Sequence, residues 1–337
     1  MSDVDSFANA NDVAMCYRYF LHREPENSAI VKVHLRNKPT VWQLIQAFLE
    51  SREHETAGID DGCMGIWRQQ DGRGVRVESS EPANAAILEH VQKIWSAYGI
   101  DDPYYSVLTN TAYQANNITN ALTEQFYQSG IEDVANFTLA CERNRIEIDP
   151  RWHILDLGCG VGRIGEHFCK YFEYYYGVDI SKEHLNHAMN RLNTTHIRNA
   201  SLMLLDDALE GNIDFDVFYS MITLQHNPPP IIYYLLDKFL AKLKPRGLAF
   251  FQVPCHLYDY EFDVERYLAG QGKSDRMEMH ALPHRYVFEV LHKRGLQPIE
   301  VWPFPVIGPI GISYVFFARK GSPTVGNTNR SITSVSE

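Results

Sequence analysis

One stretch of the sequence concentrates residues that can hold a ligand: ILDLGCGVGRIGEHF, residues 154–168. An apolar run leads to Asp156, and four glycines follow it. A strand that runs into such a turn and then into a helix lets bare backbone approach a ligand closely, and the helix start offers free N–H groups. The stretch therefore predicts a pocket for a nucleotide-like ligand.

The segment GVGRIG, residues 160–165, also fits GxGxxG, which taken alone is a weak sign of a dinucleotide-binding fold. Asp179, 23 positions after Asp156, ends the next apolar run, where an acid can accept hydrogen bonds from both ribose hydroxyls. A closing antiparallel hairpin departs from the parallel order of a dinucleotide fold, so the features together disfavour NAD. The glycines could instead serve a tight turn alone, and Asp179 could cap the following helix.

These residues need a scaffold, and the sequence from residue 153 onward predicts one. Short apolar runs alternate with helical stretches, which is typical of βαβ units and a parallel sheet covered on both faces. Two final runs, residues 296–302 and 311–320, have no helix between them and should pair as an antiparallel hairpin. The expected strands are HILDL, YYYGVDI, SLMLL, FDVFYSMITL, LAFFQVP, LQPIEVW and GISYVFFARK.

The part of the chain before residue 151 is predicted to be helical. Apolar residues recur there at spacings of three and four, with Thr40 as a candidate helix cap and a glycine-rich and aspartate-rich break between two helical regions. The expected organisation is a helical module at 1–56, a linker at 57–82, a helical cap layer at 83–150, an α/β domain at 151–320 and a disordered tail at 321–337.

The segments DLGCGVGR, GVDIS and LLDDA, together with the closing hairpin, resemble class I methyltransferases that use S-adenosylmethionine. The resemblance covers about half of the chain, residues 150 to 320, and implies a Rossmann-like α/β fold with a seven-stranded sheet and S-adenosylmethionine as cofactor. It implies that Asp156, Gly158 and Gly160 hold the methionine portion, Asp179 the ribose, and Asp207 with Ala208 the adenine edge. Cys159, Gly162 and Ile180 complete the expected donor-binding residues.

His226 is the first candidate for a catalytic base. It follows the run FDVFYSMITL, which should end beside the methyl group, and an imidazole titrates near working pH. A structural histidine bonded to the turn before NPPP is the alternative. Histidines occupy the strand ends where metal-dependent relatives usually carry acids, so no metal is expected; His280 and His284 with Glu278 are the alternative metal ligands.

Four residues are predicted to contact the methyl acceptor. Tyr104 and Tyr105, in the aromatic segment DDPYYSVLT expected as a loop, could stack on a sugar ring or pack the helical layer. His256 and His284 are the other two. His184 and His187, on the helix after GVDIS, are expected on a solvated face.

The segments YRYFLHREPENSAI and FLESREH resemble a small helical domain found beside bacterial cell-surface polysaccharide enzymes. The sequence therefore favours O-methylation of a sugar hydroxyl on a glycan or its precursor, with a possible protein partner at the N-terminal helical module. A small-molecule or protein acceptor is the alternative enzyme. A module that binds S-adenosylmethionine without turnover is the alternative from another class.

The amino-acid composition limits the class of protein and the ligands that are expected. Among 337 residues, 45% are hydrophobic and 22% charged, which is ordinary for a globular protein. The net charge of −11 argues against a broad nucleic-acid surface. The six cysteines show no paired CxxC spacing, and neither a secretory leader nor an apolar run long enough for a membrane span is evident, so reduced thiols and a cytoplasmic location are expected.

Overall fold

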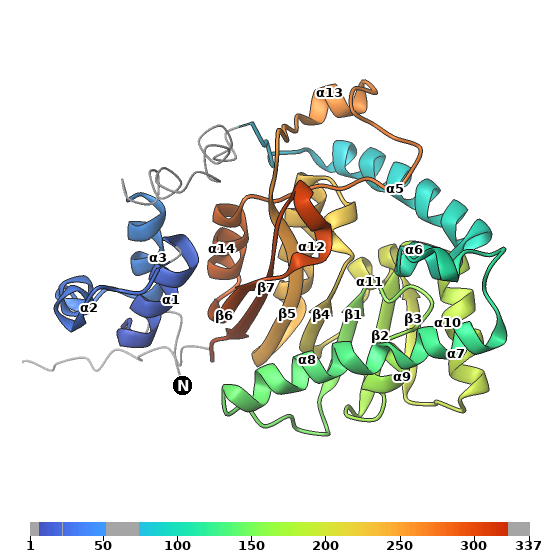
Figure 1. The fold of residues 1–337 in the computed structure, drawn as a ribbon, viewed down its shortest axis with the longest axis horizontal. Helices are drawn as coiled ribbons and strands as arrows, with labels where there is room; N and C mark the ends of the chain where they lie inside the picture. The colour runs from blue at the N-terminus through green and yellow to red at the C-terminus, as the bar shows by residue number, and fades with distance from the viewer. Residues whose placement is uncertain (1–6, 22, 52–73, 323–337) are drawn as a thin grey trace, which may run out of the picture.

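The computed structural model describes residues 7–21, 23–51 and 74–322 and places a seven-stranded sheet at the centre of the molecule (Figure 1). The strand order is β3-β2-β1-β4-β5-β7-β6. Strands β1 to β5 pair in parallel, whereas β7 is antiparallel to both β5 and β6. The predicted α/β sheet and its antiparallel closing strands are therefore confirmed. The strands are β1 (His153–Leu157), β2 (Tyr174–Asp179), β3 (Ala200–Leu204), β4 (Phe215–Ser220), β5 (Leu243–Leu257), β6 (Leu296–Pro303) and β7 (Gly311–Lys320).

Successive strand residues point to opposite sides of the sheet, so each strand contributes side chains to both faces. Different helices cover these two faces. On one face, Phe137 of α8 packs edge-on against Tyr219 and Phe250. On the other face, Phe218 stacks on Phe239 of α12. Both faces are thus apolar, as expected for a parallel sheet buried between helices. The helices that follow β1 are α9 (Gly165–Phe168), α10 (Lys182–Thr194), α11 (Leu205–Glu210), η3 (Leu224–His226), α12 (Pro229–Lys242), α13 (Val264–Leu268), α14 (His284–Lys293) and η4 (Pro305–Ile310).

The helices before β1 lie at two different places in the fold. Its long first helix, α5, crosses the C-terminal ends of the strands, and its last helix, α8, packs on the sheet (Figure 1). The expected aromatic loop at 101–109 contains a short helix. These elements are α5 (Glu81–Asp101), α6 (Pro103–Val107), η2 (Thr111–Tyr113), α7 (Asn120–Gln128) and α8 (Gly130–Arg143). The packing of α8 means that the α/β layer structure begins before residue 151.

The N-terminal helices pack beside β6, the edge strand of the sheet, and against helix α14 (Figure 1). Thr40 caps the third helix as predicted, since its side chain accepts a hydrogen bond from the backbone N–H of Gln43. Trp42 stacks on His292 of α14 with ring centroids 4.4 Å apart. The module therefore shares one apolar core with the sheet. Its helices are α1 (Ala10–Phe20), α2 (Ser28–Leu35) and α3 (Val41–Leu49).

Several expectations fall partly or wholly outside the described residues. Of the predicted linker at 57–82, only residues 74–82 are described, and of the predicted tail only residues 321 and 322. The described cysteines are free thiols, namely Cys16, Cys141, Cys159, Cys169 and Cys255. In the part of the chain that the structure covers, no helix has both the length and the apolar character that crossing a bilayer requires.

The docking of the N-terminal module can be tested at Phe20, which is 2% exposed and lies 5.5 Å, centroid to centroid, from Phe288 of α14. We expect Phe20→Ala to lower the free energy of unfolding by about 3–5 kcal/mol, because it removes a buried ring and leaves a cavity. Phe7→Ala is the matched control, since that ring is 65% exposed. Urea denaturation checks both; equal losses in the two variants would contradict the described packing.

Candidate functional site

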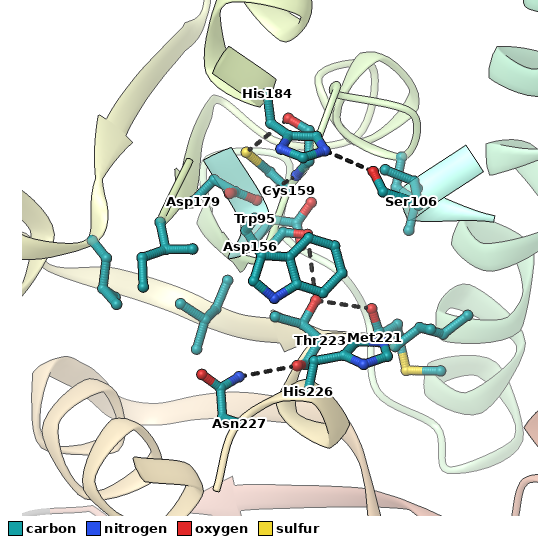
Figure 2. Close-up of a pocket in the computed structure, with 18 of the residues that line it drawn as sticks. Trp95, Ser106, Asp156, Cys159, Asp179, His184, Met221, Thr223, His226 and Asn227 are labelled. Carbon is teal, nitrogen blue, oxygen red and sulfur yellow. Dashed lines mark hydrogen bonds between the residues drawn. The ribbon is translucent and has the colours of Figure 1, made fainter. Parts of the chain in front are cut away.

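A pocket opens where strands β1, β2 and β4 end, and its lining includes Val91 and Trp95 of helix α5 (Figure 2). Asp156 and the glycine loop reach it from β1, and Asp179 reaches it from β2. The turn after β4 contributes Thr223 and His226. Parallel strands bring their carboxyl ends to one edge of the sheet, which is why residues distant in sequence meet here.

The glycine loop requires residues without a Cβ atom. Gly158, Gly160 and Gly162 have φ angles of +81°, +53° and +83°, a left-handed region in which other residues are strained. A Cβ atom on Gly158 would lie 2.1 Å from the side chain of Thr223, and one on Gly160 would lie 2.9 Å from Val107. The glycines thus serve both the turn and the close approach of neighbouring elements.

Hydrogen bonds fasten this loop to strand β2. The N–H groups of Gly158 and Cys159 donate to the carbonyl of Val178 at 2.7 and 3.1 Å, and the N–H of Gly160 donates to Oδ2 of Asp179 at 2.9 Å. The N–H groups of these three turn residues are therefore already bonded within the protein, whereas the helix start, at which free N–H groups are expected, lies further along at Gly165. The buried thiol of Cys159 lines the pocket, and burial raises its pKa.

Asp179 holds the loop and the next helix at once. Its Oδ1 accepts from the N–H of Ser181 at 2.9 Å, while Oδ2 accepts from Gly160. The cap of α10 is Ser181, whose Oγ accepts from the N–H of His184 at 3.2 Å. The carboxylate lines the pocket with Ile180 beside it. Each carboxylate oxygen has a second acceptor site, so Asp179 can still receive hydrogen bonds from a ligand.

Asp156 is a buried acid with a perturbed pKa. Tyr175 donates to its Oδ2 at 2.8 Å. Burial raises the pKa of Asp156 to about 7, although the Tyr175 hydrogen bond and the positive charge of Arg163 act in the opposite direction. Arg163 also lines the pocket; its Nη1 is 2.7 Å from Oδ2 of Asp133, and its buried Nε has no hydrogen-bond partner. The pocket lining thus contains both an acid and a cation.

His226 lies in the wall of the same pocket and is 7% exposed. Its Nδ1 is 2.8 Å from the carbonyl of Glu278, and its Nε2 is 3.1 Å from Nε2 of Gln225. Burial, the largest cause, and the nearby His280 lower the pKa of His226 to about 4. The expectation that its imidazole titrates near working pH is therefore wrong, because desolvation disfavours the charged form.

Two pocket residues could not be singled out from the sequence. Trp95 of α5 lies between His184 and His226, with ring centroids 6.1 and 5.1 Å away (Figure 2). His184 is 1% exposed, and its Nε2 is 2.8 Å from Oγ of Ser106. The expected solvated position of His184 is thus wrong, because α5 and α6 cover that face of α10. His187 is half-buried beside Tyr104.

The expected adenine residues lie apart from the pocket lining. Asp207 is exposed in the first turn of α11, and Ala208 is buried in the core. Leu205, at the start of the same helix, lines the pocket instead. The roles of Asp207 and Ala208 remain predictions.

The expected acceptor residues also lie outside the pocket lining. Tyr104 packs edge-on against Phe126 with centroids 5.2 Å apart, and Tyr105 is half-buried on the same short helix. His256 is buried near the end of β5. The ring centroid of His284 lies 6.0 Å from that of Phe20 in the N-terminal module. Their acceptor contacts therefore stay predictions.

Glu278 and His280 form a buried hydrogen-bonded pair next to His226. Oε2 of Glu278 is 2.8 Å from Nε2 of His280 and also accepts from the hydroxyl of Tyr267 at 2.8 Å. Nδ1 of His280 is 2.7 Å from the hydroxyl of Tyr260. Within the described ranges, no three His, Cys, Asp or Glu side chains are grouped so that they could hold a metal ion.

Comparison with known proteins supports a methyltransferase. Residues 154–247 match the profile of a methyltransferase domain family. Among solved structures, phosphoethanolamine N-methyltransferase 1 of Haemonchus contortus is 13% identical, with a TM-score of 0.50 over 75% of this chain and 52% of that one. Magnesium protoporphyrin IX methyltransferase of Synechocystis PCC 6803 is 14% identical, with a TM-score of 0.47 over 68% of this chain and 98% of that one. A comparison with curated protein sequences finds no significant match.

Residues 154–247 are thus similar to a methyltransferase domain, and they lie within the Rossmann-like mixed sheet that the sequence predicts. At these identities the structural likeness concerns the fold. The domain match agrees with S-adenosylmethionine as the cofactor that the sequence predicts. The pocket at the strand ends is accordingly the candidate donor site.

The steric role of Gly158 gives the first prediction for this site. We expect Gly158→Ala to reduce binding of S-adenosylhomocysteine at least ~10-fold, because the new Cβ would push Thr223 and the loop into the pocket. Gly295→Ala is the matched control, since Gly295 has φ +70° but no atom within 4 Å of its added Cβ. Calorimetric titration checks both variants; equal affinities would contradict a specific clash at Gly158.

The neutral state of His226 predicts how stability depends on pH. Its pKa is about 4 in the folded chain and near 6.5 when unfolded, so only the unfolded state gains a proton between these values. The free energy of unfolding should fall by up to ~3 kcal/mol as the pH drops from 6.5 to 4. We expect His226→Asn to remove this part of the pH dependence, whereas the exposed His196→Asn retains it. Urea denaturation across this pH range distinguishes the two.

Proposed function

We propose that this chain transfers a methyl group from S-adenosylmethionine to a hydroxyl group, with a sugar as the acceptor and His226 as the group that receives the proton. The observation that carries the proposal is the convergence of the glycine loop, Asp179 and His226 on one pocket. The resemblance of the N-terminal helices to a domain found beside polysaccharide enzymes favours a glycan or its precursor over other hydroxyl compounds.

The charges in the pocket fit the methionine portion of the donor. The buried Nε of Arg163 has no partner, which suits a carboxylate, and the buried Asp156 suits an ammonium group. Asp179 would accept hydrogen bonds from the ribose hydroxyls. Ile180 and Leu205 supply apolar contacts for the adenine ring.

The bound donor supplies an electrophilic methyl group on a sulfonium. In transfer to a hydroxyl, the oxygen–carbon bond forms as the carbon–sulfur bond breaks, and the hydroxyl proton must leave. His226 is neutral at physiological pH, so its Nε2 can accept that proton. Its depressed pKa means that the proton then passes readily to water. The protein otherwise accelerates the step mainly by holding the two reactants in line.

Trp95 favours a sugar acceptor. Its half-buried indole lines the pocket next to His226. An indole offers a broad apolar face and one N–H donor, which matches the apolar C–H face and the hydroxyls of a sugar ring. The acceptor would then lie between α5 and the turn after β4.

A second candidate function is methylation of an amine on a small molecule or protein. The low basicity of His226 favours it, because a neutral amine needs no base to attack the methyl group. A protein that binds S-adenosylmethionine without transferring its methyl group could use the same glycine loop. The N-terminal helices would then form the surface that binds a protein partner.

Transfer of labelled methyl groups from S-adenosylmethionine into fractions of a bacterial lysate separates these functions. We expect label in nucleotide sugars or lipid-linked glycans, and at least ~10-fold weaker donor binding in Asp179→Asn, which loses charge-assisted hydrogen bonds. Asp214→Asn, at an exposed position, is the matched control. Label in proteins or small amines would reassign the acceptor, and donor binding without any label would favour the binding module. An unchanged rate in His226→Asn would exclude His226 as the base.

A further inference from the structure

A chain of buried side chains leads from β7 to His226 and fixes how each amide points. The backbone N–H of Ile222 lies 3.0 Å from Oε1 of Gln252. A backbone N–H can only donate, so this end of the Gln252 amide must be the oxygen. Its NH2 end therefore donates to Oγ of Ser313 and, at 3.1 Å, to Oε1 of Gln225.

The same reasoning continues to the imidazole. Because Gln225 uses its oxygen to accept from Gln252, it presents its NH2 to Nε2 of His226 at 3.1 Å. On the other side of the ring, Nδ1 is 2.8 Å from the carbonyl of Glu278, which can only accept. Both contacts require one tautomer, with the hydrogen on Nδ1 and the lone pair on Nε2.

The surroundings fix which end of each amide faces its partner. Gln225, Gln252 and Ser313 are 3%, 0% and 2% exposed. Ile222 has φ +58°, a strained conformation for a β-branched residue, and its N–H is held by Gln252. Rotating the Gln252 amide would leave that N–H facing an NH2 group inside the protein.

We propose that Gln225 is a positioning residue for methyl transfer: its NH2 group, aimed by Gln252, holds His226 in the neutral tautomer with the lone pair on Nε2. The proposal rests on the proposed function, in which His226 receives the acceptor proton. The acceptor hydroxyl takes the place of the Gln225 NH2 at Nε2. Its O–H bond then breaks toward Nε2 as the new oxygen–carbon bond forms, and the carbon–sulfur electron pair stays on sulfur.

The ionisable groups that face His226 support this assignment. His280 opposes a positive charge on His226. The carboxylate of Glu278 accepts hydrogen bonds from His280, Tyr267 and the N–H of Ser274 and lies 3.8 Å from Nε2 of His90, while its backbone carbonyl pairs with Nδ1 of His226. Gln225 is thus the group at Nε2 whose replacement should change the proton affinity of the ring.

Nitrogen NMR of histidine-labelled full-length protein tests the proposal without an acceptor. His226→Asn assigns the signal among the 14 histidines. In the unchanged protein we expect the Nδ1–H tautomer, with protonation near pH 4. Gln225→Glu places an acceptor at Nε2, so the titration should move upward by about 1 pH unit or more. The acidic limb of the rate profile should move with it. Gln125→Glu, on the exposed face of α7, is the matched control and should leave both unchanged.

A double-mutant cycle tests the role of Gln252, which does not touch His226. Gln252→Met frees the Gln225 amide to turn its oxygen toward Nε2, so the titration should again move upward, by a smaller amount. In a Gln225→Met background the same change should have no effect. A full shift in that background, or a Gln225→Glu titration equal to the control, would overturn the proposal. If Gln252→Met fails to fold, the Gln225 variants decide alone. A titration that follows these expectations in a protein without transfer activity would uphold the tautomer and overturn the proposed function.

Discussion

The hydrogen bond from the N–H of Gly160 to the carboxylate of Asp179 joins the two strand ends on which the pocket depends. It ties the turn after β1 to the end of β2, while the second oxygen of Asp179 orients the start of α10. The loop can adopt this path only because its glycines tolerate positive φ angles and leave room for Thr223 and Val107. One carboxylate thereby fixes the glycine loop and the start of α10 on two sides of the candidate donor site.

The parts of the fold that could be predicted are those encoded by short stretches of sequence. The glycine spacing in residues 158–162, the apolar runs that form the strands and the lack of an α-helical pattern between the last two runs all report local conformation. The structure does form a short 3-10 helix, η4, between those two strands, which the sequence did not predict. The cap at Thr40 is of the same kind. Asp156 and Asp179 could be placed in the site because each lies at or next to the carboxyl end of its strand, and parallel strands end at the same edge of the sheet.

The rest of the site depends on contacts between distant segments. Trp95 and His184 carry no local signal, since their place in the pocket follows from how α5 and α6 lie on the domain. The sequence places Arg163 in the glycine loop, but its ion pair with Asp133 depends on how α8 packs. The proton affinity of His226 could not be predicted either, because it is set by burial and by a carbonyl 52 residues later in the chain. Helical spacing placed His184 on a helix but could not show which face another helix would cover.

The path of α5 bears on where the working unit of this protein begins. Val91 and Trp95 of that helix belong to the pocket wall, and Phe137 of α8 lies in the core beneath the sheet. A fragment cut at residue 151, where the sequence changes character, would keep the glycine loop yet open the pocket on one side and expose an apolar sheet face. The part of the chain that forms a closed pocket therefore begins with helix α5 at residue 81, not at residue 151.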